Sequence, residues 1–412
     1  MNIVSAMLYS TALILSLCSS KHVPVRGTAF AQLIYFNQLY DYVTGVGRRS
    51  PTFCLLTLDG SETHTTDVRN IEHILKTNFD KYTKDKYNID IMKDLLGEGI
   101  FVVDGEKWKK QRKVASSEFA TRVLRDFSCC VFRKNAAKLV KVLEELSAAS
   151  EGFDMQDILM RCTLDSIFKV GFSVELNCLE GSSKEGRAFI KALLSIDSKA
   201  RLRNNITLID NFMHQNDKED ILSRILLESE KDPENMNDKY LRDIILNFMI
   251  QKIAEEIKEG MGDQTSEANS DWFVKRITDP NGKCAETDDV LPDGFHVKKG
   301  DGIYYWAYSM GRMRNIWGED AEDFKPERWL KDGIFQKRIT FQICCIQCLF
   351  AGPGICLGKD FAYRQMKIVP IALLCFLCFR LADETRPVTY KVMFTLHNDN
   401  GLHLRAVPRL AM

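Results

Sequence analysis

The chain has 412 residues, which is enough for one large domain or two ordinary ones. Its 56 basic residues balance its 56 acidic residues, so the net charge of zero argues against a strongly basic, nucleic-acid-binding surface. A hydrophobic content of 45% excludes wholesale disorder. The 13 cysteines are an odd number without a repeated spacing, which favours reduced thiols in a cytosol-facing protein over a disulfide framework.

The N-terminal segment contains an uncharged apolar run. Residues 3–18 (IVSAMLYSTALILSLC) carry no charge, and Lys21, His22 and Arg26 follow them. The run is slightly shorter than the roughly 17–25 residues of a membrane-spanning helix. Basic residues after the run favour a retained anchor with the rest of the chain on the cytosolic side, whereas a cleaved signal peptide would carry a basic residue before it. We expect a membrane anchor within residues 1–20, with a cleaved signal or a buried helix as the alternatives.

A pair of strands and a capped helix are expected early in the chain. Residues 53–65 (FCLLTLDGSETHT) predict two short strands joined by a turn at Asp59–Gly60. Asp67 is the expected N-cap of the helix that follows. The apolar positions of this helix follow helical spacing: Val68, Ile71, Ile74 and Leu75.

Helical patterns dominate the middle of the chain, to about residue 260. Within GEKWKKQRK, Trp108 and Arg112 are four residues apart and therefore share one helical face. Beyond Lys283 the pattern changes to short strands and turns. Residues 388–396 alternate in polarity before a hairpin turn at Asn400–Gly401. The sequence predicts a mostly α fold with small β-sheets in one body.

A glycine-rich loop around one cysteine precedes another helical pattern. Residues 350–358 (FAGPGICLG) place Cys356 among three glycines and a proline. Glycine allows close approach of the backbone to a bulky partner, and a thiolate near a helix N-terminus is electrostatically favoured. This geometry suits a flat cofactor whose metal takes sulfur as an axial ligand. It equally suits a buried structural cysteine at an ordinary loop–helix junction.

Several longer stretches carry a specific family resemblance. They are GEGIFVVDGEKWKKQRK, YLRDIILNFMI, AETDDVLPDGFHVKKGDGIYY, WGEDAEDFKPERWL and CLGKDFAYRQMKIV. In this order they resemble a microsomal plant cytochrome P450, and most closely the group that hydroxylates long-chain fatty acids at or near the methyl end. The resemblance extends from about residue 25 to the C-terminus.

The resemblance implies a cytochrome P450 fold for residues 21–412. It also implies haem b as cofactor and electrons from NADPH through NADPH–cytochrome P450 reductase. One oxygen atom would be inserted into a long-chain fatty acid, on the cytosolic face of the endoplasmic reticulum membrane, and no nucleic acid would be bound.

The resemblance also implies residue roles in the haem site. Cys356 would be the proximal thiolate on the haem iron, and Phe350 would lie beside the thiolate and shield it. The remaining cofactor-binding positions would be those that contact a haem propionate or form the cysteine loop: Trp108, Arg112, Gly352 and Gly358.

Arg328 of PERW would belong to a buried ion-pair triad that stabilises the fold beneath the haem. Taken singly, these residues also have ordinary structural interpretations. Trp108 could be a packing residue, Arg112 a solvated helix charge and Arg328 a surface arginine.

The chain departs from the family in its central helix and in the Glu-x-x-Arg helix. The acid–threonine stretch that bends over the haem is absent, because YLRDIILNFMI continues directly into QKIAEEIKEG at Ile250–Gln251. No Glu-x-x-Arg sequence occurs anywhere in the chain. Arg328 is therefore expected to lack its partners, and breaking a buried ion pair costs about 3–5 kcal/mol. No catalytic residue of the family is retained in these segments.

The cysteine loop itself also departs from the family. Gly354 replaces the arginine expected two residues before Cys356, and Leu349 stands where the loop phenylalanine should be. The upstream sequence ICCIQCLF contains Cys345-x-x-Cys348, which could bind a metal together with Cys356. No histidine or fourth cysteine lies at zinc-site spacing, which argues against such a site. Pro370 falls inside the following helix, where proline costs about 3 kcal/mol unless the helix bends.

Two hypotheses follow for the function. The chain is either a haem-thiolate monooxygenase, or a catalytically inactive or non-folding relative with an incomplete P450 fold. Deletions at clean joins suggest an aberrant splice form, a mis-predicted gene model or a decaying duplicate.

Overall fold

The computed structural model describes a defined part of the chain. These residues are 23–57, 61–85, 97–119, 122–148, 152–181, 282–331, 334–335, 352–385, 389–392 and 396–409, together with 89 and 93. The expected anchor, the Ile250–Gln251 join and the Cys345-x-x-Cys348 pair lie outside them. Within the described ranges, no helix is long and apolar enough to cross a membrane.

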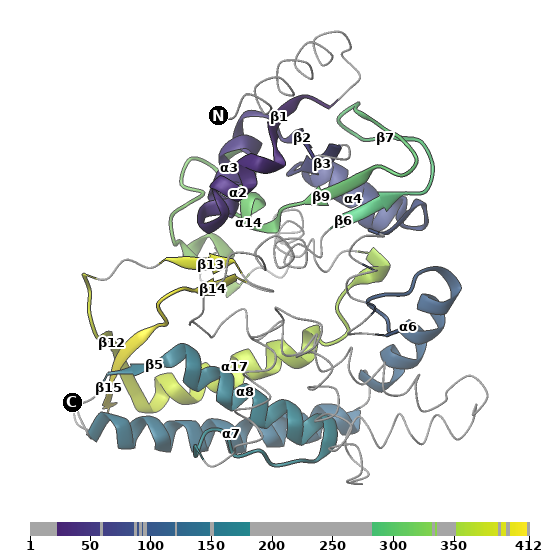
Figure 1. Ribbon diagram of the computed structural model, residues 1–412. Coiled ribbons are helices and arrows are strands. Elements are labelled where there is room, and N and C mark those ends of the chain that lie inside the picture. Colours follow the sequence, from purple (N-terminus) through teal and green to yellow (C-terminus); the bar gives the residue numbers. More distant parts are fainter. Residues whose placement is uncertain are drawn as a thin grey trace. The chain divides into compact units, whose positions relative to one another are not determined.

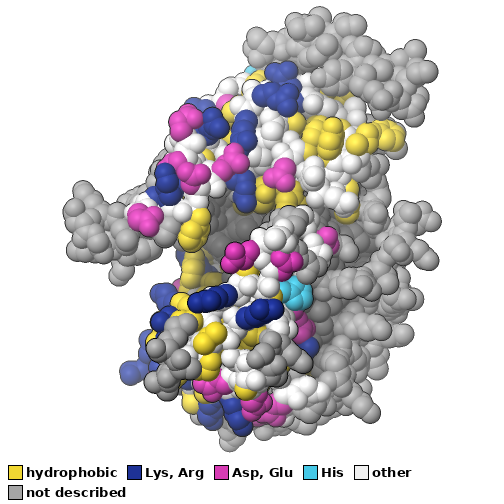
Figure 2. All heavy atoms as spheres, turned by 90° about the vertical axis from the view of Figure 1, so that its left-hand side faces the viewer, with side chains coloured by type: hydrophobic (Ala, Val, Ile, Leu, Met, Phe, Trp, Pro, Cys, Tyr) yellow, Lys and Arg dark blue, Asp and Glu magenta, His cyan; other side chains and the backbone are white. Residues whose placement is uncertain are grey.

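The chain forms two compact units, each made of two separate segments. Unit 1 comprises residues 1–88 and 279–356, and unit 2 comprises residues 89–278 and 357–412. Figure 1 shows the two units with their labelled elements. Figure 2 shows acidic and basic side chains interspersed over the described surface of one face, in keeping with the zero net charge.

Unit 1 is built on a six-stranded sheet in the order β1-β2-β3-β9-β6-β4. Its strands are β1 (Val25–Thr28), β2 (Thr52–Leu56), β3 (Ser61–Thr65), β4 (Tyr82–Lys84), β6 (Gly282–Ala285) and β9 (Gly302–Tyr305). Strands β2 and β3 pair antiparallel from Thr52↔Thr65 to Leu56↔Ser61, so the predicted strand pair is confirmed. Its Asp59–Gly60 turn lies outside the described residues.

The remaining elements of unit 1 are short helices and two small ribbons. The helices are α2 (Ala29–Ile34), η1 (Phe36–Gln38), α3 (Leu39–Arg49), α4 (Val68–Glu72), η2 (His73–Thr77), η3 (Phe79–Lys81), α14 (Ala307–Met310), α15 (Arg314–Trp317), η4 (Pro326–Trp329) and η6 (Gly352–Gly354). The ribbons are β7 (Asp289–Val290) with β8 (His296–Val297), and β10 (Leu330–Lys331) with β11 (Ile334–Phe335).

The predicted N-cap of α4 is confirmed. The Asp67 carboxylate accepts a hydrogen bond from the backbone N–H of Arg69 at 2.9 Å, which satisfies a donor in the first turn. The apolar positions of this helix face the core of unit 1, where Ile71 and Ile74 are fully buried. After Glu72 the helix widens into the π-helical turn η2.

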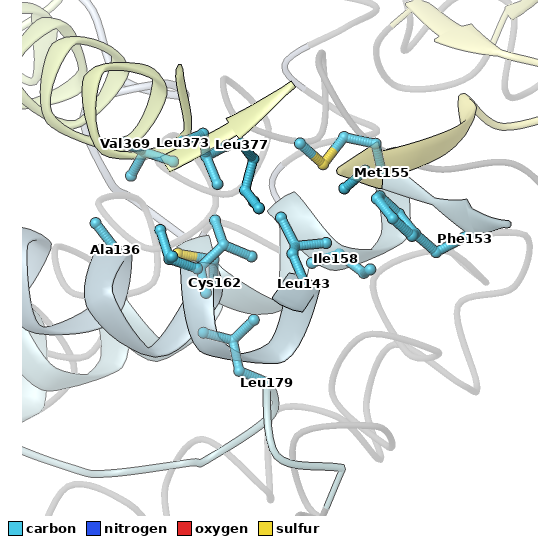
Figure 3. Close-up of a cluster of buried hydrophobic side chains, with 13 residues drawn as sticks. Ala136, Leu143, Phe153, Met155, Ile158, Cys162, Leu179, Val369, Leu373 and Leu377 are labelled. Atoms are coloured by element: carbon cyan, nitrogen blue, oxygen red, sulfur yellow. The ribbon is translucent and has the colours of Figure 1, made fainter. Parts of the chain in front are cut away.

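Unit 2 packs three long helices around a common core. They are α7 (Arg122–Ala148), α8 (Met155–Phe172) and α17 (Lys359–Phe376), and α7 contacts both of the others. The shorter helix α6 (Gly105–Phe119) precedes them. Figure 3 shows the core, in which Val369 and Leu373 of α17 lie over Cys162 of α8 and Leu143 of α7.

The strands of unit 2 form two small sheets. One has the order β12-β15-β5, with β12 (Leu377–Leu381), β15 (His403–Pro408) and β5 (Phe153–Asp154). The other pairs β13 (Tyr390–Val392) with β14 (Leu396–Asn398). With the helices of both units, these small sheets confirm a mostly α fold with small β-sheets.

The alternating pattern near the C-terminus corresponds to strand structure. Of the alternating residues, Tyr390 and Val392 lie on β13 and Leu396 lies on β14, and these two strands pair antiparallel with each other. Val388 and Phe394 lie outside the described residues. Asn400–Gly401 does form a turn, in which the Gly401 N–H donates to the Asn398 carbonyl at 3.3 Å. This turn joins β14 to β15, and those strands belong to different sheets.

Helix α17 contains a proline, and two cysteines lie near its C-terminal end. Pro370 lies inside α17, which continues to Phe376. The apolar helical pattern around Cys375 and Cys378 predicts two packing cysteines on a helix, but Cys375 is exposed and Cys378 lies half-buried on β12. None of the cysteines in the described ranges forms a disulfide.

A carboxylate on β7 binds three side chains from the segment after α4. Oδ2 of Asp289 accepts hydrogen bonds from His73 Nε2 at 2.9 Å, from Asn78 Nδ2 at 3.2 Å and from the Tyr82 hydroxyl at 2.9 Å. Burial would raise the pKa of Asp289, but these hydrogen bonds and one from the Val290 N–H outweigh burial and lower it to about 2. The carboxylate therefore stabilises unit 1 in its ionised form.

We predict that Asp289→Asn reduces the acid sensitivity of the protein. Because the pKa of Asp289 is lower in the folded protein, its stabilisation is complete above pH 4 and is lost as the pH falls towards 2. The wild type should therefore lose about 2 kcal/mol more unfolding free energy than Asp289→Asn between pH 5 and 2. Urea unfolding at each pH measures this difference. The exposed Glu319→Gln variant should behave like the wild type, and equal pH slopes for wild type and Asp289→Asn would contradict the prediction.

Candidate functional site

The predicted loop–helix junction around Cys356 is confirmed. The loop opens with η6, in which the Ile355 N–H donates to the Gly352 carbonyl at 3.3 Å. Cys356 follows as a half-buried thiol outside any disulfide. Gly358 is buried and caps α17, and its carbonyl accepts a hydrogen bond from the Ala362 N–H at 2.9 Å.

Gly352 is required by both its backbone conformation and its surroundings. Its φ of 68° lies in the left-handed region that favours glycine. A Cβ at this position would lie 1.9 Å from the carbonyl oxygen of Leu75 and 3.1 Å from Cα of Lys76. Gly352 therefore lies close to a neighbour, and within unit 1 that neighbour is the backbone of η2 rather than a bulky partner.

Gly354 differs from Gly352 in both respects. It is exposed, and a Cβ there would make an ordinary contact, 3.7 Å from the Phe79 ring. A larger residue is therefore sterically acceptable at its Cβ. As glycine, position 354 offers no side-chain donor to an anionic group.

Trp108 and Arg112 lie on one face of α6, as predicted. The Arg112 guanidinium carbon is 5.9 Å from the centroid of the Trp108 ring, within the range of a cation–π contact, and both side chains are half-buried. Gln111, in the middle of the helix, connects it to the preceding segment, because its Nε2 donates to the Glu98 carbonyl at 2.8 Å. These residues belong to unit 2 and Cys356 belongs to unit 1, so each is described within its own unit.

The expectation that Arg328 lacks partners is wrong. Its guanidinium donates to the Trp317 carbonyl at 3.1 Å and to the Asp320 carbonyl at 2.8 Å. The Asp320 carboxylate lies 3.5 Å away as an ion-pair partner. The loop between α15 and η4 thus satisfies Arg328 locally, without a Glu-x-x-Arg helix.

Phe350 and Leu349 lie outside the described residues. Among the residues that the structure does describe, no group of three or more histidine, cysteine or acidic side chains could hold a metal ion. A single thiol such as that of Cys356 is not such a group.

The described donors fit a haem in chemical type. Cys356 is a half-buried thiol directly before a helix, and thiolate is a known axial ligand of haem iron. Arg112, stacked on an aromatic ring, is a suitable donor to a carboxylate. Gly354 contributes no such donor.

The sequence did not identify the support of the cysteine loop. Gly352 signalled that a close neighbour was needed, but nothing in the local pattern pointed to Leu75 and Phe79. These residues lie far earlier in the chain, and only the folding of unit 1 brings them to the loop.

Comparisons with known proteins identify the family of this chain. The sequence profile described as "Cytochrome P450" matches residues 30–271 and 276–404. Cytochrome P450 704C1 of Pinus taeda is 39% identical over 482 aligned positions, covering 94% of this chain and 92% of the relative. Cytochrome P450 704B1 of Arabidopsis thaliana is 34% identical, covering 92% and 93%.

A solved structure shares the fold at low sequence identity. The crystal structure of the cytochrome P450DA heme domain superposes with a TM-score of 0.74 at 17% identity, covering 94% of this chain and 97% of that one. With the family profile matching most of the sequence and plant relatives above 30% identity, the chain belongs to the cytochrome P450 family.

Proposed function

We propose that this chain is a haem-thiolate protein of the group that hydroxylates long-chain fatty acids, in a form that does not complete the reaction. The cytochrome P450 family consists of haem monooxygenases, so the reaction class follows from family membership. The observation that carries the haem-thiolate role is the Cys356 loop: a half-buried thiol between two glycines, directly before α17. The substrate class rests on the resemblance of the longer sequence stretches to fatty-acid hydroxylases.

The residues of this chain would divide the binding of the haem among them. Cys356 would ligate the iron, and Arg112, oriented by Trp108, would bind a propionate. Phe350 would shield the thiolate, and Gly358 would bring the backbone close to the cofactor. Haem b, when bound, supplies the oxygen-activating chemistry, while the protein must deliver protons and exclude water.

The protein segments that should deliver protons and stabilise the haem site are incomplete in this sequence. The acid–threonine stretch and the Glu-x-x-Arg helix are missing from the 412 residues. One comparison result supports internal deletions. The alignment to the pine relative has 482 positions, more than the 412 residues of this chain, so it requires gaps in this sequence.

The partners follow from the same proposal. NADPH–cytochrome P450 reductase would supply the electrons, and residues 1–20 would anchor the chain to the endoplasmic reticulum with its body on the cytosolic face. The uncharged run followed by basic residues supports this orientation.

We predict that Cys356 is the cysteine that ligates haem iron. The reduced full-length chain, loaded with haemin, should give a thiolate-type carbon-monoxide difference spectrum, and Cys356→Ser should abolish it. Cys375→Ser, an exposed thiol on α17, is the matched control and should keep the spectrum. A thiolate spectrum that persists in Cys356→Ser would exclude the assignment.

We predict that the chain does not hydroxylate long-chain fatty acids at a rate above that of Cys356→Ser. The assay co-expresses the chain with a plant reductase, supplies NADPH and fatty acids, and quantifies hydroxylated product by mass spectrometry. Restoring the central-helix and Glu-x-x-Arg segments from a plant relative, together with Gly354→Arg, should restore product formation. Product from the unaltered chain above the Cys356→Ser level would refute the loss of turnover.

We predict that residues 3–18 anchor the chain to membranes. Full-length protein should remain in the microsomal pellet after alkaline carbonate extraction, and a variant that begins at Lys21 should be released. Release of the full-length chain would contradict the anchor, and a mature N-terminus near residue 20 would show cleavage of a signal instead.

A further inference from the structure

The cysteine loop rests on one particular segment of unit 1. At Gly352 the loop leaves no room for a Cβ beside the Leu75 carbonyl, and a Cβ at Gly354 would lie 3.7 Å from the Phe79 ring. Both neighbours belong to residues 73–82, which contain η2, η3 and the start of β4. The position of the cysteine loop therefore depends on the position of the backbone in residues 73–82.

Apolar burial holds one side of the segment. Ile74 is fully buried and Leu75 is 5% exposed in the core of unit 1. Burial is non-directional, so it fixes where these side chains lie but not the direction of the Leu75 carbonyl. That carbonyl is the group against which Gly352 packs.

Directional contacts come from Asp289. Its Oδ2 is bound by His73 at the start of the segment, by Asn78 within it and by Tyr82 at its end. The Asn78 N–H also donates to the His73 carbonyl at 2.8 Å and closes the π-helical turn. One carboxylate thus fixes both ends of the stretch that carries Leu75 and Phe79.

Asp289 is itself fixed to the core of unit 1 through the β7–β8 ribbon. It pairs with Val297 across the ribbon of β7 and β8, and Val297 is 2% exposed in the same core. The carboxylate is 12% exposed, and hydrogen bonds to a charged, largely buried group are among the stronger ones in proteins.

We propose that Asp289 is a positioning residue for Cys356: through His73, Asn78 and Tyr82 it holds the segment on which the cysteine loop rests. The inference builds on the proposed role of Cys356 as the haem ligand. It concerns the geometry of the loop in this chain, which exists whether or not haem is bound.

The test measures the accessibility of Cys356 in the full-length, haem-free chain. The protein is alkylated with iodoacetamide, and the rate at each cysteine is followed by peptide mass spectrometry. The exposed thiols of Cys130 and Cys375 in unit 2 are internal references. In Asp289→Ala the Cys356 rate should rise about tenfold, the factor that corresponds to about 1.4 kcal/mol, while the reference rates stay constant.

Asp293→Asn is the matched control in the same unit. Its carboxylate binds Thr52 and Asn70 at 2.6 and 2.7 Å, before the supporting segment begins. It should leave the Cys356 rate unchanged even where it lowers stability. An unchanged Cys356 rate in Asp289→Ala, an equal rise at Cys130 and Cys375, or the same rise in Asp293→Asn would each overturn the proposal.

Tyr82→Phe keeps the test decisive if Asp289→Ala unfolds the chain. It removes a single hydroxyl that donates to Asp289, so the fold should persist and the Cys356 rate should rise by a smaller factor. With no rise in Tyr82→Phe under those conditions, the proposal fails.

Haemin loading separates this inference from the proposed function. In Asp289→Ala the share of bound haem that gives the thiolate-type carbon-monoxide spectrum should fall, and in Asp293→Asn it should be retained. If the unaltered chain gives no thiolate spectrum, the proposed function fails, and the alkylation rates still decide whether Asp289 positions the loop.

Discussion

The close approach of Gly352 to the Leu75 carbonyl is the constraint on which the candidate haem site depends. Backbone lies against backbone there, at a distance that no residue with a Cβ could accept. The approach sets the path of the chain through η6 to Cys356. It also makes the site dependent on distant parts of unit 1, because η2 is held by the core on one side and by Asp289 on the other.

The cost of the missing Glu-x-x-Arg helix is smaller than a broken buried triad would imply. Arg328 is 21% exposed and is satisfied by two backbone carbonyls and by a half-exposed Asp320 carboxylate. An ion pair of this exposure contributes about 0–1 kcal/mol, compared with about 3–5 kcal/mol for a buried pair that loses a partner. The described part of unit 1 therefore retains a satisfied arginine, although the family's partners for it are absent from the sequence.

Helix α17 shows how packing outweighs a local defect. Pro370 lacks an N–H and costs about 3 kcal/mol inside a helix. Val369 and Leu373, on either side of it, are buried in the core of unit 2 (Figure 3), and each such burial contributes about 1.5–3 kcal/mol. The two burials together exceed the penalty, so the helix continues from the cysteine loop to β12.

Features that depend on neighbouring residues were determined by the sequence alone. The β2–β3 pair, the Asp67 cap, the shared face of Trp108 and Arg112 and the loop before α17 all follow from spacing within a few residues. The ordered family stretches determined the cytochrome P450 fold in the same way. Only the tertiary structure decided the partners of Arg328, the exposure of Cys375 and the pairing of β13 with β14. It also decided that Gly352 packs against the Leu75 carbonyl. The partners, exposure and strand pairing depend on how the surrounding residues pack. The contact of Gly352 depends on a segment far away in the chain. None of these leaves a periodic signal in the local sequence.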